Sequence, residues 1–123
     1  MKKIVNLRER LDKMVELWSP RVVGEVNDTY VKLVKMKGEL AWHSHADEDE
    51  LFLVLSGKLR LEMETGTVEL GEGEFYVIPR NLPHNPISED GCEIILIEPK
   101  GTRHTGDTLT KRTKSIAEQL KED

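Results

Sequence analysis

Two histidines and a glutamate lie within one short stretch, at a spacing that suits a metal ion. His43 and His45 are two positions apart, and Glu50 follows five positions after the second histidine. In an extended strand, alternate side chains point to the same face, so both imidazoles would point in one direction. A short polar turn and a returning strand would bring Glu50 beside them. Imidazole and carboxylate groups together suit divalent transition metals, and a fourth donor would strengthen this interpretation.

The candidate fourth donor is His84, which follows a short apolar stretch. The segment from Phe75 to Ile78 predicts a strand that Pro79 ends, and the loop after it carries His84. A side chain just past a strand end can face the mouth of a β-barrel, where ligand sites commonly occur.

Three acidic residues precede Glu50 and could compete with it as metal ligands. They are Asp47, Glu48 and Asp49. A solvated turn between two strands is the favoured interpretation of this run, and a base or lid near the site is the alternative.

An amphipathic helix is predicted from Asn6 to Trp18, before the strands that carry the donors. Its apolar residues recur at helical spacing: Leu7, Leu11, Met14, Val15 and Trp18. Asn6 can cap the helix, and Glu9 three positions later completes a capping-box pattern. Pro20 ends the helix, because the residue before a proline avoids the helical region. We expect the helix to pack on a core or on a neighbouring subunit.

From about Val22 to Pro99 the sequence predicts many short strands. Leu59, Leu61 and Met63 alternate with charged residues, which predicts a half-buried strand, and the last clear strand runs over 94–97. Short strands separated by glycine or proline turns indicate an all-β sandwich or barrel. Long crossover helices are absent, which argues against a parallel α/β sheet.

The pattern is weaker in the C-terminal tail, residues 100–123. The stretch 102–113 is polar and mixed. Ser115 and Glu118 could cap a short helix that contains Ile116 and Leu120. A short ordered helix and a frayed tail both remain open.

Together the motifs resemble those of the cupins, a family of small metal-binding β-barrels. The first cupin motif is matched by Gly38, the two histidines, Glu50 and Gly57, and the second by Gly73, Pro79 and His84. The matching stretch spans residues 38–84. There are three departures: four residues rather than five separate Gly38 from His43, Asn81 replaces a glycine, and Ser88 replaces an asparagine. Asparagine tolerates positive φ, so the turn at Asn81 can form.

The resemblance implies a single cupin domain over residues 1–123, with a double-stranded β-helix, or jelly-roll barrel, at about 22–99. It also implies that His43, His45, Glu50 and His84 are the metal ligands. Three neutral imidazoles and one carboxylate suit iron, manganese, nickel, cobalt or zinc as a divalent ion. Four protein ligands on an octahedral ion leave two positions for water, substrate or dioxygen. A cupin barrel without a physiological metal is the alternative.

Three functions are compatible with such a barrel, and whether the protein is an enzyme stays open. The first is a metal-dependent dioxygenase that acts on a small organic acid, phenol or diketone-like substrate. The second is an isomerase, epimerase or decarboxylase that uses the metal as a Lewis acid, for which the sequence identifies no clear base. The third is a non-catalytic module that binds a small molecule. Fold alone does not choose among them.

The composition of the chain argues against some classes of binding partner. The chain has 123 residues and a net charge of −5, which argues against a nucleic-acid binder with a basic face. Cys92 is the single cysteine, so no intrachain disulfide can form. The N-terminus lacks the apolar core of a signal peptide, and no apolar run reaches the length of a membrane span. We therefore expect a cytoplasmic protein that binds a small molecule, with neither nucleic acid nor membrane as a partner.

Two further expectations concern apolar and basic side chains. The run Leu51–Leu55 is apolar on both faces, so one face needs cover from the N-terminal helix or a second subunit, and we expect a homodimer. Four aromatic residues are expected in the core or pocket wall: Trp42, Phe52, Phe75 and Tyr76. Arg60 either lines the barrel or faces water. Arg80 could hold a substrate carboxylate, although a solvent-facing arginine is the commoner case.

Overall fold

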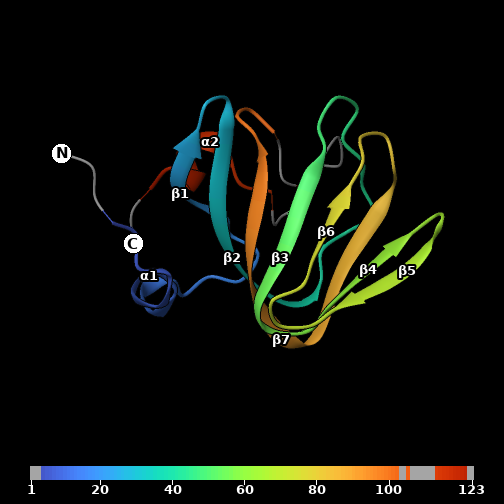
Figure 1. The fold of residues 1–123 in the computed structure, drawn as a ribbon, viewed down its shortest axis with the longest axis horizontal. Coiled ribbons are helices and arrows are strands. Elements are labelled where there is room, and N and C mark those ends of the chain that lie inside the picture. The colour runs from blue at the N-terminus through green and yellow to red at the C-terminus, as the bar shows by residue number, and fades with distance from the viewer. Residues whose placement is uncertain (1–3, 103–104, 106–112, 122–123) are drawn as a thin grey trace.

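Antiparallel strands make up most of the protein, with a short helix near each end of the chain (Figure 1). The computed structural model describes residues 4–102, 105 and 113–121, so much of the predicted C-terminal tail lies outside the described residues. The elements are α1 (Leu7–Lys13), β1 (Arg21–Val26), β2 (Thr29–Glu39), β3 (Glu50–Gly57), β4 (Leu59–Met63), β5 (Gly66–Leu70), β6 (Phe75–Ile78), β7 (His84–Pro99) and α2 (Ile116–Gln119). No helix in this described part of the chain has the length and apolarity to cross a membrane.

The strands pair in the order β1-β2-β7-β3-β6, and β4 pairs with both β5 and β7. Strand β7 belongs to two parts of this sheet. Its first residues, from His84 to Ile87, pair with β4, and its later residues, from Cys92 to Pro99, lie between β2 and β3. The all-β prediction is confirmed. The final strand is much longer than the expected 94–97, because it also runs through Pro86 and Gly91, and Gly91 has a φ of 98°. Figure 1 shows β7 bending at the bottom of the view.

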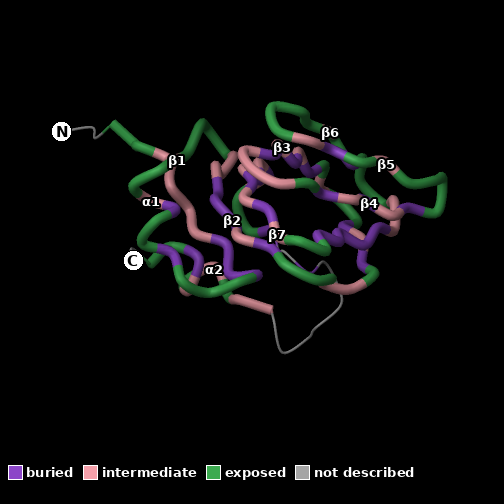
Figure 2. The backbone as a smooth tube through the Cα atoms, turned by 90° about the horizontal axis from the view of Figure 1, so that it is seen from below, coloured by how far each residue is buried: buried purple, intermediate pink, exposed green. Residues whose placement is uncertain are grey.

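Alternating side chains of the strands fill the interior. In β4, Leu59, Leu61 and Met63 are buried, which confirms the predicted half-buried strand. Phe52 and Val54 of β3 pack into the same core cluster. Figure 2 shows these buried stretches in purple.

Two of the four aromatic residues expected in the core or pocket wall lie outside it. Trp42 is 49% exposed and Phe75 is 60% exposed, whereas Phe52 is only 2% exposed. Phe75 pairs with Leu53 on the outer face of the sheet, because β6 turns Ile78 inward.

The N-terminal helix is shorter than predicted. Asn6 caps it through the backbone N–H of Glu9, as expected, but the helix ends at Lys13 and Met14 has an extended backbone. Met14 packs on the outer face of the sheet with Leu33, whereas Trp18 lies in the interior core. A continuous helix would place these two residues on one face. The chain therefore crosses from the outside to the inside of the sheet as an irregular strap, with a turn at Trp18, where φ is 57°.

Hydrogen bonds to β2 hold this strap. The backbone N–H of Trp18 donates to the carbonyl oxygen of Lys35 at 2.7 Å, and its indole N–H donates to that of Lys37 at 2.9 Å. Lys35 in turn donates to the carbonyl oxygen of Met14 at 2.8 Å, which satisfies an acceptor that the end of the helix leaves open.

The short C-terminal helix is present as α2. Ser115 and Glu118 form the predicted capping box. Gln119 is the buried residue of this helix, and Leu120 is 48% exposed. The helix therefore meets the barrel through a polar side chain.

Candidate metal centre

The four candidate donors converge from three parts of the chain. His43 and His45 lie in the irregular segment between β2 and β3, rather than in the strand that we predicted. Glu50 is the first residue of β3, and His84 is the first residue of β7 rather than part of a loop. All four residues are at most 5% exposed.

Backbone pairing brings the two histidine segments together. The N–H of His43 donates to the carbonyl oxygen of His84 at 3.0 Å, and the N–H of His84 donates to that of His43 at 2.9 Å. Each residue of the group offers a ligand atom, and these atoms all lie within 4.8 Å of one another. The Oε1 atom of Glu50 lies 3.0 Å from Nε2 of His45 and 3.1 Å from Nε2 of His84. This separation is compatible with one ion bound by all four groups.

In two of the histidine rings, a backbone carbonyl determines which ring nitrogen can bind a metal ion. Nδ1 of His43 lies 2.8 Å from the carbonyl oxygen of Ala41, and Nδ1 of His84 lies 2.8 Å from that of Leu82. A carbonyl oxygen only accepts, so each Nδ1 carries the hydrogen and a neutral ring has its lone pair on Nε2. Nε2 of His43 is buried without a hydrogen-bond partner in the described structure. This is the arrangement in which a bound cation would satisfy the nitrogen.

The pKa values agree with this donor set. Burial, with a smaller contribution from His84, lowers the pKa of His43 from 6.5 to about 4. Burial alone would raise the pKa of Glu50, but its contacts with the side chains of Glu98, His45 and His84 hold it well below its usual value. At pH 7 His43 is neutral and Glu50 is ionised, which are the states that a metal ion requires.

Comparison with known proteins identifies the fold family. The family model described as "Cupin domain" matches residues 30–98, which is more than half of the chain. The chain belongs to the cupin family. A crystal structure of a cupin-2 domain protein from Shewanella frigidimarina superposes with a TM-score of 0.77 at 41% identity, covering 79% of this chain and 95% of that one. The predicted cupin barrel is therefore confirmed.

Two curated relatives share part of this cupin sequence. Protein YdbB of Bacillus subtilis, described as uncharacterized, is 35% identical over 85 residues, which are 68% of this chain and 75% of the relative. The 3-hydroxyanthranilate 3,4-dioxygenase 2 of Aspergillus fumigatus is 34% identical over 70 residues, which are 52% of this chain and 36% of that enzyme. The chain thus spans about a third of the enzyme's length.

The departures from the cupin motif leave its turns in place. Asn81 adopts a positive φ of 66°, and its N–H donates to the carbonyl oxygen of His45 at 2.7 Å. The substituted residue therefore helps to hold the His45 segment. The motif residue Gly57 has a φ of 82°, and a Cβ there would lie 2.3 Å from the carbonyl oxygen of Gly91.

The acidic run and Arg80 interact with each other beside the site. The backbone N–H of Arg80 donates to Asp49 at 2.8 Å, and its guanidinium lies 3.5 Å from the same carboxylate. These contacts connect the loop before β3 to the loop before β7. In this cupin, Asp49 lies on the surface while Glu50 is buried.

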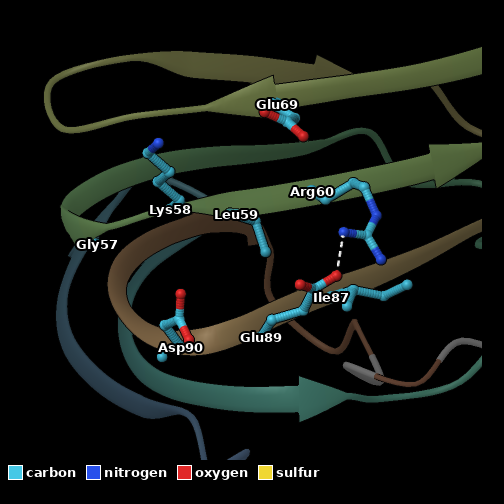
Figure 3. A pocket seen from close by; sticks show the side chains of 9 residues that line it. Gly57, Lys58, Leu59, Arg60, Glu69, Ile87, Glu89 and Asp90 are labelled. Carbon is cyan, nitrogen blue, oxygen red and sulfur yellow. Dashed lines mark hydrogen bonds and ion pairs between the residues drawn. The ribbon is translucent and has the colours of Figure 1, made fainter.

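Two hollows differ in their relation to the donors. A cavity of about 10 Å³ adjoins His43 and Glu50, and its other lining residues are mainly apolar, including Trp18, Phe52 and Leu96. A larger surface hollow of about 350 Å³ lies beside Lys58 and Arg60, near the opposite end of the β4–β7 ladder from His84 (Figure 3).

The larger hollow is not the metal centre. The guanidinium of Arg60 is already paired, at 2.6 Å with Glu89 and at 3.4 Å with Glu62. Arg60 therefore faces the surface rather than the barrel interior.

Three buried polar residues between the centre and α2 were missed by sequence reasoning. They are Lys32, Glu98 and Gln119, each at most 1% exposed. Lys32 and Glu98 are charged residues among apolar neighbours in strands, at inward positions of the alternation, and that pattern is a signal that could have identified them.

Proposed function

We propose that the protein binds a divalent transition metal through His43, His45, Glu50 and His84, and that it oxygenates a small organic substrate there. The observation that carries the proposal is the buried Nε2 atom of His43, which has no hydrogen-bond partner in the described structure and adjoins three further donors. An ion at this position would supply Lewis-acid chemistry and a site for dioxygen.

The chain's own residues would orient and shield this ion. The carbonyls of Ala41 and Leu82 hold the rings of His43 and His84 with their lone pairs turned inward. Glu50 provides the negative charge that partly neutralises the ion. Apolar residues of the cavity wall, including Phe52 and Leu96, would keep bulk water away from the ion on that side.

The surroundings of the cavity favour oxygenation over proton transfer. An isomerase or epimerase needs a base beside the substrate. Among the described residues that line the small cavity, His43 and Glu50 are the titratable ones, and both belong to the donor set. The partial similarity to 3-hydroxyanthranilate 3,4-dioxygenase supports the same choice. A Lewis-acid enzyme and a non-catalytic binding module remain the alternatives.

Elemental analysis of protein purified without added metal tests the first half of the proposal. We expect close to one transition-metal ion per chain, and a loss of most of it in His45→Ala and in His84→Ala. Arg60→Gln, which alters the surface hollow, is the control that should keep the metal. Equal metal content in the wild type and His84→Ala would contradict the site.

Oxygen consumption tests the second half. We expect the metal-loaded protein to consume dioxygen with a panel of small phenols, organic acids and diketones, and His45→Ala to lose this activity. Conversion of a substrate without oxygen uptake would favour the Lewis-acid alternative. Tight binding of a ligand that is released unchanged would favour the binding module.

We also propose that the protein is a homodimer in a reducing cytoplasmic compartment. Leu51 and Leu53 face outward on β3, where they pair with Val77 and Phe75 of β6. Phe75 is 60% exposed and Val77 is 44% exposed, and such a continuous apolar patch supports association with a second copy. The single cysteine supports the reducing compartment.

A further inference from the structure

A chain of buried polar groups runs from the metal centre to the C-terminal helix. The buried carboxyl groups of Glu50 and Glu98 lie against each other. Nζ of Lys32 lies 2.6 Å from Oε2 of Glu98 and 2.5 Å from Oε1 of Gln119 on α2. These four residues are at most 1% exposed.

Strand register explains why the charged residues meet. Leu51 of β3 pairs with Ile97 of β7, so the next position of the same antiparallel register sets Glu50 opposite Glu98. On the other side of β7, Lys32 of β2 pairs with Leu96, which is two residues from Glu98. Long side chains can reach such a diagonal neighbour. Three adjacent strands therefore direct Glu50, Glu98 and Lys32 into one buried space.

Such a cluster costs free energy to bury. Two carboxylates placed opposite each other repel, and a buried ion pair is frequently no more stabilising than apolar residues of the same volume. Oε1 of Glu98 is buried without a hydrogen-bond partner in the described structure. The carboxyl group of Glu98, held by Lys32, lies against Glu50 and so restricts the orientations open to Glu50.

We propose that Glu98 is a positioning residue for the metal ligand Glu50, and that Lys32 and Gln119 hold Glu98 in place. The C-terminal helix thereby contributes to metal affinity, although it supplies no ligand. The inference rests on the proposed metal site. Groups that hydrogen-bond to metal ligands orient them, and their loss typically weakens metal binding by about 10- to 100-fold.

The test measures the affinity for Co²⁺ by competition with a chromophoric chelator, together with the absorption spectrum of the Co²⁺ form. The main variant is Lys32→Met combined with Glu98→Met, because replacing both partners by apolar residues avoids leaving a charge buried alone. We expect its affinity to fall by about 10-fold or more and its spectrum to shift. A merely structural pair would leave both measurements unchanged.

Conservative and distal variants sharpen the test. Glu98→Gln can still accept from Lys32 and donate to Glu50, so we expect an affinity within about threefold of the wild type. Gln119→Leu, at the far end of the chain of contacts, should weaken Co²⁺ binding. Leu120→Ala on the same helix is the matched control and should not, since this side chain is half exposed.

The outcomes separate the two proposals. Suppose that the double variant keeps the affinity and spectrum of the wild type while His84→Ala loses Co²⁺. This result would overturn the role of Glu98 and leave the proposed metal site intact. A wild type that binds Co²⁺ no better than His84→Ala would overturn both. If the double variant does not fold, Gln119→Leu decides, and an affinity equal to that of Leu120→Ala would contradict the inference.

Discussion

Single atoms determine what the centre can bind. The carbonyl oxygens of Ala41 and Leu82 each accept from an Nδ1 atom, and they thereby leave the Nε2 lone pairs of His43 and His84 available within the group of four donor atoms. Burial of His43 also makes its charged form unfavourable, which keeps the lone pair on the ring. The proposed metal affinity and the pH-dependent stability therefore depend on the same side chains.

Lowering the pH should destabilise the metal-free protein through His43. Its pKa is about 4 in the folded protein and near 6.5 when unfolded, so between these values the unfolded chain binds more protons. The free energy of unfolding should thus fall as pH falls from 6.5 to 4, by at most about 3 kcal/mol from this residue. Urea denaturation at pH 7 and pH 5 in the presence of a chelator measures the change.

A control variant isolates the contribution of this histidine. His43→Gln should show a smaller loss of stability between pH 7 and pH 5 than the wild type, because the group that titrates is gone. An equal pH dependence in both proteins would assign the effect to other groups.

At the scale of elements, tight turns set the position of the donors. Gly57 ends β3, the strand that begins with Glu50, and its φ of 82° and its close approach to Gly91 leave no room for a side chain. Gly38 also has a positive φ, 83°, but no atom lies within 4 Å of the position that its Cβ would take. Substitution of Gly38 would therefore introduce backbone strain alone, and substitution of Gly57 would introduce both strain and a steric clash.

We expect Gly57→Ala to destabilise the protein more than Gly38→Ala. Gly38→Ala introduces strain alone, at a cost of about 1–2 kcal/mol. Gly57→Ala adds a Cβ contact of 2.3 Å to a backbone oxygen and 2.9 Å to Cα of Cys92, and backbone atoms cannot move aside like the end of a flexible side chain. Thermal denaturation of both variants measures the difference, and equal losses would contradict the predicted clash.

At the scale of the whole molecule, the outer face of the sheet is covered only in part. Helix α1 packs Leu11 and Met14 against Leu33, with Leu55 and Ile95 beside them. Among the described residues, Phe75 and Val77 at the β6 edge remain exposed. A second copy of the chain is the occupant that we propose for this edge.

Light scattering coupled to size-exclusion chromatography tests this assembly. We expect the wild type to have the mass of two chains and Phe75→Glu to have the mass of one, because a buried carboxylate opposes association. Val15→Glu, at a position that is 88% exposed on the strap, is the matched control and should remain dimeric. A monomeric wild type at micromolar concentration would contradict the proposal.

The sequence by itself determined the features that depend on local spacing. The caps at Asn6 and Ser115 and the alternation in β4 are short-range patterns, and the structure contains each of them. The candidate donor set was also readable, because the spacing of His43, His45, Glu50 and His84 follows a family motif, and these four residues meet as one buried group.

Only the tertiary structure decided the features that depend on pairing between distant strands. Pro86 normally argues against a strand interior, yet β7 continues through it, since its carbonyl oxygen still accepts from the N–H of Leu40. Met14 and Trp18 share a helical spacing, yet they are buried on opposite sides of the sheet. Burial of Lys32 depends on Glu98 and Gln119, which lie 66 and 87 residues away in the chain. Local periodicity contains no information on such partners, because burying a charge requires the complete set of groups that surround it.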